Sequence, residues 1–147
     1  MSVISQKIKE NFFCSTYQEA VPSTLNVEVT NLCNLSCVMC ASRGSKRSKG
    51  FMDISLYKNI LGEAIDLGIK QVGLFSTGES ILHPDIVEFI KISKSKSIYT
   101  YLDINGNEMD DGLIENIVES GLDSLKFSID AHTQEIYKEI RRGGNFD

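Results

Sequence analysis

A regular alternation of short runs that favour β-strands with helical segments limits what this chain can fold into. From about residue 25 onward, four such runs are each followed by a turn and then by apolar residues at helical spacing. Because each helix returns the chain to the end where its strand began, we expect an α/β fold of parallel strands with right-handed crossovers. The predicted strands are Leu25–Thr30, Gln71–Phe75, Ile98–Ile104 and Ser124–Ile129.

Local capping signals place the helices between these strands. Asp, Ser and Thr side chains favour the start of a helix, proline fits its first turn, and glycine favours the position after its last residue. We therefore expect helices that begin at Asp53 or Ser55, at Pro84 and Asp85, at about Asp110 and at Thr133, with Gly68 and Gly121 ending the first and third.

Four loops of unusual composition follow the four strands. In parallel sheets, ligands bind beyond the carboxyl ends of the strands, where such loops share one rim. The loops are CNLSCVMC at 33–40, STGES at 76–80, NGN at 105–107 and DAH at 130–132. The sequence therefore predicts a single site at this rim.

The first of these loops contains three cysteines within eight residues, Cys33, Cys37 and Cys40. This spacing suits a shared metal better than mutual disulfides, and thiolates bind zinc or iron-sulfur clusters. Zinc normally takes a fourth ligand, but His83 and His132 are distant in sequence and are better read as a helix-start residue and a surface-turn residue. From the spacing alone, a cluster, a structural zinc site and plain buried thiols all stay open.

At these residues the chain resembles the radical S-adenosylmethionine (radical SAM) superfamily, whose signature has this cysteine spacing with an apolar residue, here Met39, before the last cysteine. The stretches EVTNLCNLSCVMC, GLFSTGESILHPDI, LDING and KFSIDAHTQEIYKEIRRGGNF are similar to the branch that often carries a C-terminal SPASM auxiliary-cluster domain. The resemblance implies the first four βα units of an incomplete, TIM-like parallel βα barrel. Residues 1–24 would be an N-terminal extension, and 25–147 a core truncated after the fourth unit.

The same resemblance implies the cofactors and the chemistry. A 4Fe-4S cluster would bind Cys33, Cys37 and Cys40, and S-adenosylmethionine would be cleaved reductively to a 5'-deoxyadenosyl radical that takes hydrogen from a peptide or small-molecule substrate. An electron donor such as flavodoxin or ferredoxin would be a partner. The cofactor brings the reactivity, and the protein brings binding and orientation.

The resemblance also assigns residues to S-adenosylmethionine. Gly78 and Glu79 would receive its ammonium, with glycine allowing backbone carbonyls to approach. Two positions depart from the family pattern, because Ser80 replaces the usual proline and Ile104 stands where a threonine is common. The remaining assignments are the backbone of Met39 against the adenine, Asn105 at the third-strand turn, Ser128 on the ribose or carboxylate, and Arg141 on the carboxylate.

Composition excludes several other classes. A net charge of -5 leaves no basic footprint for nucleic acid, no uncharged stretch is long enough for a membrane span, and the charged N-terminus does not read as a signal peptide. We therefore expect a cytoplasmic protein without nucleic-acid or membrane partners. Cys14 is assigned no function, and the basic residues between Arg43 and Lys49 are expected to be solvated, with an anionic substrate as the alternative.

Two rival functions stay open beside the radical enzyme. The first is a non-catalytic, truncated metal-binding or interaction fragment, and the second is a zinc-stabilised structural domain. Asn145 or Asp147 resembles the cap of a further helix, so we expect a truncated chain that turns over no substrate by itself.

Overall fold

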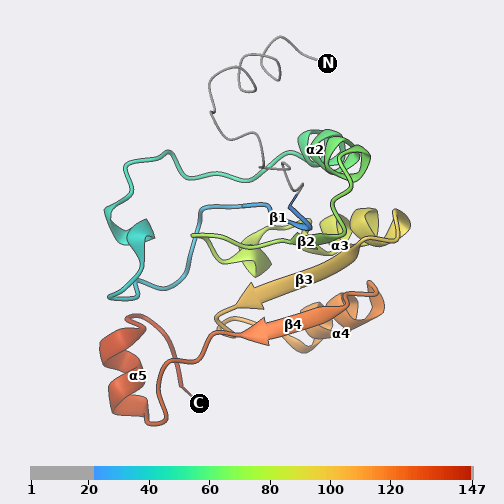
Figure 1. Ribbon diagram of the computed structural model, residues 1–147. Coiled ribbons are helices and arrows are strands. Elements are labelled where there is room, and N and C mark those ends of the chain that lie inside the picture. Colours follow the sequence, from blue (N-terminus) through green and yellow to red (C-terminus); the bar gives the residue numbers. More distant parts are fainter. Residues whose placement is uncertain (1–21, 147) are drawn as a thin grey trace, which may run out of the picture.

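The computed structural model describes residues 22–146 and shows a parallel four-stranded sheet in the order β1-β2-β3-β4 (Figure 1). The predicted α/β class and the parallel, sequential order of the strands are both confirmed. Cys14 and almost all of the proposed extension, residues 1–24, lie outside the described residues. The strands are β1 Thr24–Asn26, β2 Gln71–Gly73, β3 Tyr99–Ile104 and β4 Ser124–Phe127.

The helices begin and end close to the expected signals. Asp53, Asp110 and Thr133 each accept a hydrogen bond from a backbone N–H in the first turn of the helix that follows. Gly68 and Gly121 have φ angles of 92° and 82°, in the left-handed region that favours glycine after a helix. No helix of residues 22–146 is long and apolar enough to cross a bilayer. The helices are α2 Ile54–Asp66, α3 Ile86–Ser95, α4 Asp111–Glu119 and α5 Gln134–Ile140, with 3₁₀ turns η1 Ala41–Gly44 and η2 Ser80–Leu82.

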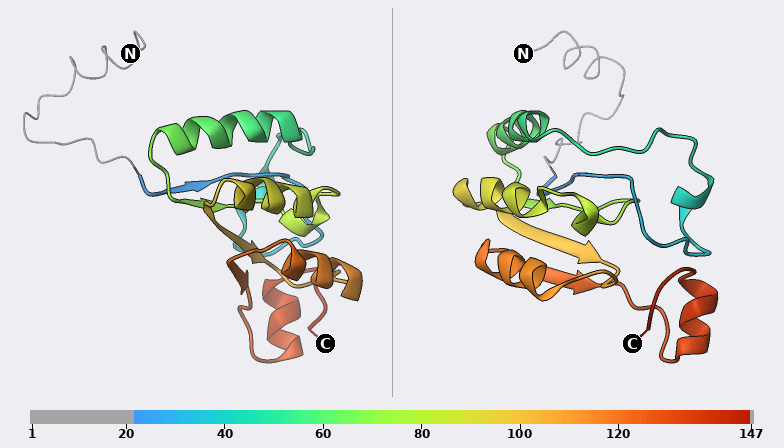
Figure 2. Two further views of the ribbon diagram at one scale, coloured as in Figure 1. Left: turned by 90° about the vertical axis from the view of Figure 1, so that its right-hand side faces the viewer. Right: turned by 180° about the vertical axis from the view of Figure 1, so that it is seen from behind.

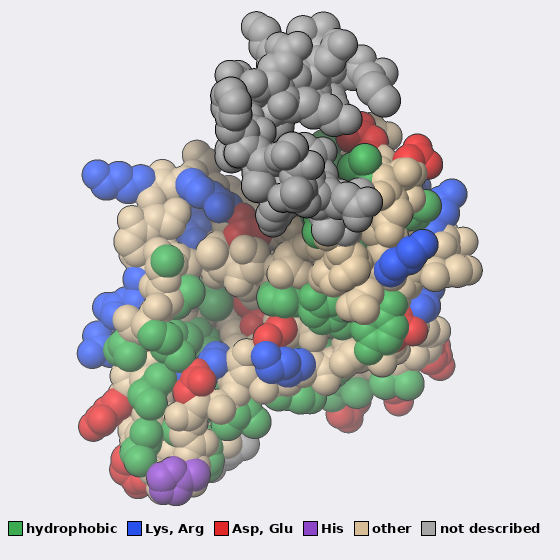
Figure 3. All heavy atoms as spheres, in the orientation of Figure 1, with side chains coloured by type: hydrophobic (Ala, Val, Ile, Leu, Met, Phe, Trp, Pro, Cys, Tyr) green, Lys and Arg blue, Asp and Glu red, His purple; other side chains and the backbone are tan. Residues whose placement is uncertain are grey.

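Within residues 22–146, helices cover one face of the sheet and no helix packs on the other. On β3, Thr100, Leu102 and Ile104 are buried in the core beneath α2, α3 and α4, whereas Tyr99 and Tyr101 point the other way. Figure 2, seen from behind, shows α3 and α4 in front of the strands. The opposite face, seen in Figure 3, carries hydrophobic and charged side chains at the surface. This uncovered face leads to the rim where the predicted site lies.

The first strand is shorter than predicted. Val27 N–H still donates to the Gly73 carbonyl (2.8 Å), where β2 ends, and the next N–H along, that of Leu74, donates to Tyr101 on β3 (3.0 Å). The chain stays buried through Val29, whose carbonyl accepts from Met52 N–H (2.7 Å), and Thr30 forms an isolated bridge with Phe51. The alternating pattern therefore predicted burial correctly, while the ladder ended because the neighbouring strand was no longer there to pair with.

The expectation that all four helices return the chain to the starting end of the sheet is wrong for α5. This seven-residue helix lies beside the cysteine loop, near the carboxyl ends of β3 and β4 (Figure 1). Backbone N–H groups of Ser36 and Val38 donate to carbonyls of Arg142 and Ile140, at 2.8 Å each. These bonds tie the carboxyl end of the helix to the cysteine loop, so α5 forms part of the rim.

The two faces of β3 should differ in their contribution to stability. Replacing Leu102, which is fully buried, with alanine should lower the free energy of unfolding by about 3 kcal/mol, because it removes a core side chain and leaves a cavity. Tyr99→Ala, on the uncovered face where Tyr99 is 44% exposed, should cost less than about 1 kcal/mol. Urea unfolding followed by circular dichroism measures both, and equal losses would contradict this assignment of the faces.

Candidate functional site

A cavity of about 350 Å³ opens at the carboxyl ends of the strands, and all nine residues predicted from the sequence line it. Its volume is within the range of small-molecule sites. The cysteine loop, the turn after β2, the ends of β3 and β4 and the end of α5 all contribute. The predicted residues on its wall are Cys33, Cys37, Met39, Cys40, Gly78, Glu79, Asn105, Ser128 and Arg141.

The three cysteines lie on a loop without regular structure that neighbouring segments hold in place. Leu35 N–H donates to Cys33 Sγ (3.4 Å), and Ser42 N–H donates to Cys40 Sγ (3.5 Å). Burial raises the pKa of Cys33 and of Cys37 above the usual thiol value. Binding a metal as thiolates would therefore release protons.

Glu79 carries the least satisfied polar group of the cavity. Its side chain is buried at 4% exposure, and Oε2 accepts a hydrogen bond from Asn105 N–H (2.7 Å). The other oxygen, Oε1, is buried and has no hydrogen-bond partner among the described residues. Burial raises the pKa of this carboxyl, and the backbone N–H groups of Asn105 and Ile81 only partly oppose that effect. A buried acceptor of this kind on a cavity wall fits a cationic or hydrogen-bond-donating ligand.

Gly78 is required by packing within the protein. A Cβ atom at this position would lie 2.1 Å from the carbonyl oxygen of Thr30 and 2.8 Å from that of Leu32. The next residue, Glu79, donates its backbone N–H to the same Leu32 carbonyl (2.6 Å). The turn after β2 therefore lies directly against the chain that enters the cysteine loop at Cys33. This is a different reason for glycine from the ligand approach expected from the sequence.

Arg141 and Ser128 reach the cavity with acidic partners already in place. Arg141 is 8% exposed, and its Nε and Nη2 bond to Asp130 Oδ2 at 2.7 and 2.6 Å. Ser128 Oγ donates to Asp103 Oδ1 (2.5 Å), and Asp103 Oδ2 pairs with Lys126 Nζ (3.1 Å). A ligand carboxylate that binds Arg141 would thus share its guanidinium with Asp130, which holds that guanidinium in position.

Several residues of this rim were not assigned from the sequence, among them Asp103 and Asn34. Asp103 lines the cavity, and strand alternation could have found it, because it falls opposite the buried Leu102 and Ile104 at the carboxyl end of β3. Asn34, inside the cysteine loop, accepts from Asn105 Nδ2 through Oδ1 (2.8 Å), while its own Nδ2 is buried without a partner among residues 22–146. That contact joins positions 71 residues apart, so no local pattern predicts it.

The two histidines do not belong to the site. His83 is buried, its Nδ1 accepts from Asp85 N–H at the start of α3, and its Nε2 lies 3.0 Å from the Met52 carbonyl oxygen. It therefore helps to start a helix, as predicted. His132 is exposed and does not line the cavity.

Three cysteine thiols are the sulfur donors on the wall of the cavity. Among the described residues, no three His, Cys, Asp or Glu side chains are arranged to hold one metal ion. In a cubane cluster each thiolate binds a different iron, so its ligands surround a larger group and need not converge on one point. Three thiols on one wall of a cavity are compatible with that arrangement.

Comparisons with known proteins agree with this geometry. The family model for the radical SAM superfamily matches residues 27–147. PqqA peptide cyclase of Gluconobacter oxydans is 31% identical over 114 residues, which cover 77% of this chain and 32% of that protein. A probable GTP 3',8-cyclase of Methanothermobacter marburgensis is 35% identical over 120 residues, 81% of this chain and 39% of that protein.

Solved structures share the fold. SuiB of Streptococcus suis, bound to S-adenosylmethionine, matches with a TM-score of 0.72 at 20% identity, over 82% of this chain and 28% of that one. BtrN in complex with AdoMet and 2-DOIA matches with a TM-score of 0.70 at 22% identity, over 79% of this chain and 49% of that one. The chain spans about a third of the length of the curated relatives it matches. With a family match over residues 27–147 and this fold, the chain belongs to the radical SAM superfamily.

Proposed function

We propose that the cavity holds a 4Fe-4S cluster on Cys33, Cys37 and Cys40 and binds S-adenosylmethionine beside it. One observation carries the proposal: nine residues chosen from four separate sequence motifs all line one cavity. When bound, the cluster would supply the electron that cleaves S-adenosylmethionine to methionine and a 5'-deoxyadenosyl radical, which takes hydrogen from a peptide or small-molecule substrate. The whole protein would draw that electron from a donor such as flavodoxin or ferredoxin.

The protein's own residues would bind and orient the cofactor. The unpartnered Oε1 of Glu79 would accept a hydrogen bond from the cofactor ammonium, which supplies the partner that this buried oxygen lacks. Arg141 would attract the carboxylate, and Ser128 would contact the ribose or carboxylate from the end of β4. Asn105 would fix the Glu79 carboxylate through its backbone N–H. Met39 lines the cavity and is 57% exposed as a residue, and its backbone would contact the adenine.

Iron binding should depend on the three loop cysteines and not on Cys14. After anaerobic reconstitution, Cys33→Ala, Cys37→Ala and Cys40→Ala should each lose most of the bound iron and the visible cluster absorption, because each removes one ligand. Cys14→Ala is the matched control, because it also replaces a cysteine with alanine but lies outside the loop at 33–40. It should bind iron like the wild type. Equal iron loss in Cys14→Ala and Cys37→Ala, measured by iron and sulfide analysis, would contradict the ligand assignment.

Glu79→Gln should have opposite effects on stability and on cofactor binding. Burial raises the pKa of Glu79, so the folded protein favours the protonated carboxyl. The contribution of this carboxyl to the free energy of unfolding is therefore complete below the usual glutamate pKa and is lost as pH rises through the raised pKa. The neutral glutamine should therefore raise the thermal midpoint of the cofactor-free protein near pH 7, and the gain should shrink toward pH 4.

The same variant should bind S-adenosylmethionine at least about tenfold more weakly, because a hydrogen bond between charged groups contributes about 1.5–3 kcal/mol. Scanning calorimetry measures the thermal midpoint, and titration of reconstituted protein by electron paramagnetic resonance measures the S-adenosylmethionine affinity. A stabilised variant with unchanged cofactor affinity would remove Glu79 from the ammonium site.

A further inference from the structure

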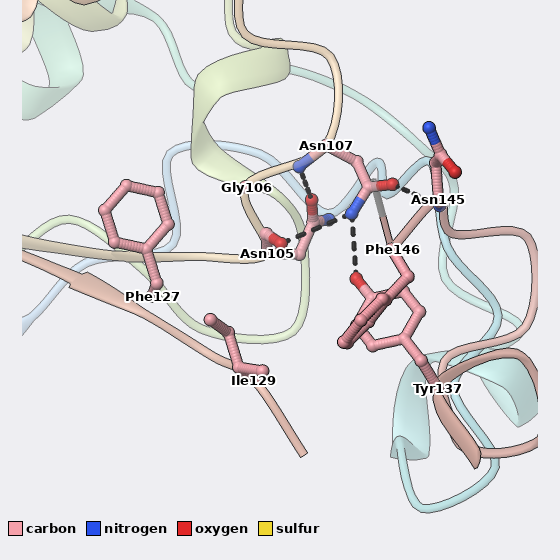
Figure 4. A pocket seen from close by; sticks show the side chains of 8 residues that line it. All are labelled: Asn105, Gly106, Asn107, Phe127, Ile129, Tyr137, Asn145 and Phe146. Atoms are coloured by element: carbon pink, nitrogen blue, oxygen red, sulfur yellow. Dashed lines mark hydrogen bonds between the residues drawn. The ribbon is translucent and has the colours of Figure 1, made fainter. Parts of the chain in front are cut away.

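Asn107 connects the site to α5 although it does not line the cavity. Its Nδ2 donates to the Tyr137 hydroxyl (2.9 Å) and to the Asn105 carbonyl (3.3 Å), and its Oδ1 accepts from Asn145 N–H (2.6 Å). Figure 4 shows these bonds converging on its side chain at the edge of a smaller hollow. An N–H group can only donate, so the Asn107 atom that Asn145 N–H contacts must be the amide oxygen. This contact fixes which end of the Asn107 amide is oxygen and which is nitrogen.

On the side toward the cavity, Asn107 sets the position of Asn105. The backbone N–H of Asn107 donates to Asn105 Oδ1 (2.8 Å), which leaves Asn105 Nδ2 to donate to Asn34 Oδ1 in the cysteine loop (2.8 Å). The backbone N–H of Asn105 donates to Glu79 Oε2 (2.7 Å). One turn thus holds both the proposed ammonium acceptor and the ligand loop.

On the other side, Asn107 holds the end of α5. Tyr137 is 3% exposed and stacks near Phe146 with ring centres 5.5 Å apart. A Cβ on Gly144 would come within 2.7 Å of the Tyr137 ring, so the chain after α5 lies directly on that ring. The same segment supplies the carbonyls that accept hydrogen bonds from Ser36 and Val38 in the cysteine loop.

We infer that Asn107 is a positioning residue for S-adenosylmethionine, acting with Tyr137 as a latch between the Asn105 turn and α5. With the latch closed, the Glu79 carboxylate and the cysteine loop are held in the arrangement that the cofactor needs. The inference rests on the proposed function, in which Glu79 receives the cofactor ammonium. Contacts outside a binding site that orient its ligands commonly change affinity or activity by about 10–100-fold.

The first test uses the full chain without cofactors. In Asn107→Ala and in Tyr137→Phe, amide hydrogen exchange at Ser36 and Val38 should become faster, because the carbonyls that these amides bond to are no longer held by the latch. Tyr57→Phe is the matched control, since it removes another buried tyrosine hydroxyl, the one bonded to Ser93 beneath the far side of the sheet. It should lower the thermal midpoint without changing exchange at Ser36 and Val38.

The second test measures S-adenosylmethionine affinity of the reconstituted protein by electron paramagnetic resonance titration. Asn107→Ala should raise the dissociation constant by about tenfold or more at unchanged iron content, and Tyr137→Phe by a smaller factor. Combining the two changes should add little to Asn107→Ala alone, because both open the same latch. Tyr57→Phe should bind like the wild type.

The outcomes separate the latch from the function on which it rests. If the wild type binds no cluster or no S-adenosylmethionine, the proposed function fails. If the wild type binds both, the latch is overturned by unchanged affinity in Tyr137→Phe and Asn107→Ala, or by unchanged exchange at Ser36 and Val38. An equal loss of affinity in Tyr57→Phe would also overturn it, because general destabilisation would then explain the effect.

Discussion

The close contact between the turn after β2 and the chain entering the cysteine loop is the constraint on which the site depends. Gly78 has no room for a side chain against Thr30, and Glu79 bonds through its backbone to Leu32. This contact brings a buried carboxylate beside Cys33, two segments that are more than 40 residues apart.

Around that contact, backbone and amide hydrogen bonds hold the cysteine loop against its neighbours. The cysteine loop has no regular structure of its own and is held by Glu79, by Asn105 and by the carbonyls after α5. These hydrogen bonds hold the three thiols at the cavity wall, which lowers the conformational entropy that ligand binding would cost. The sheet provides a rigid base because its helix-covered face is packed with fully buried side chains.

The unsatisfied oxygen of Glu79 indicates what the rim is built to bind. Burying a carboxylate with one oxygen unpaired is unfavourable, and a protein of this size has little stability to spare. A cationic ligand would reverse that cost, and Arg141 beside it would complement an anionic group. A carboxylate and a guanidinium on the wall of one cavity suit a zwitterionic amino-acid moiety such as that of S-adenosylmethionine.

The sequence by itself determined the parallel α/β architecture and the helix caps, because these follow from local periodicity and from capping chemistry. Its motifs, through their resemblance to the radical SAM superfamily, singled out nine of the residues that line the cavity. Only the tertiary structure decided that β1 is short, that α5 joins the rim, and that Asn34, Asn105 and Asn107 are linked by hydrogen bonds. Strand length depends on whether a neighbour is there to pair with, and the place of a short helix depends on which distant carbonyls and amides need partners. Those conditions exist only once segments far apart in the sequence have come together.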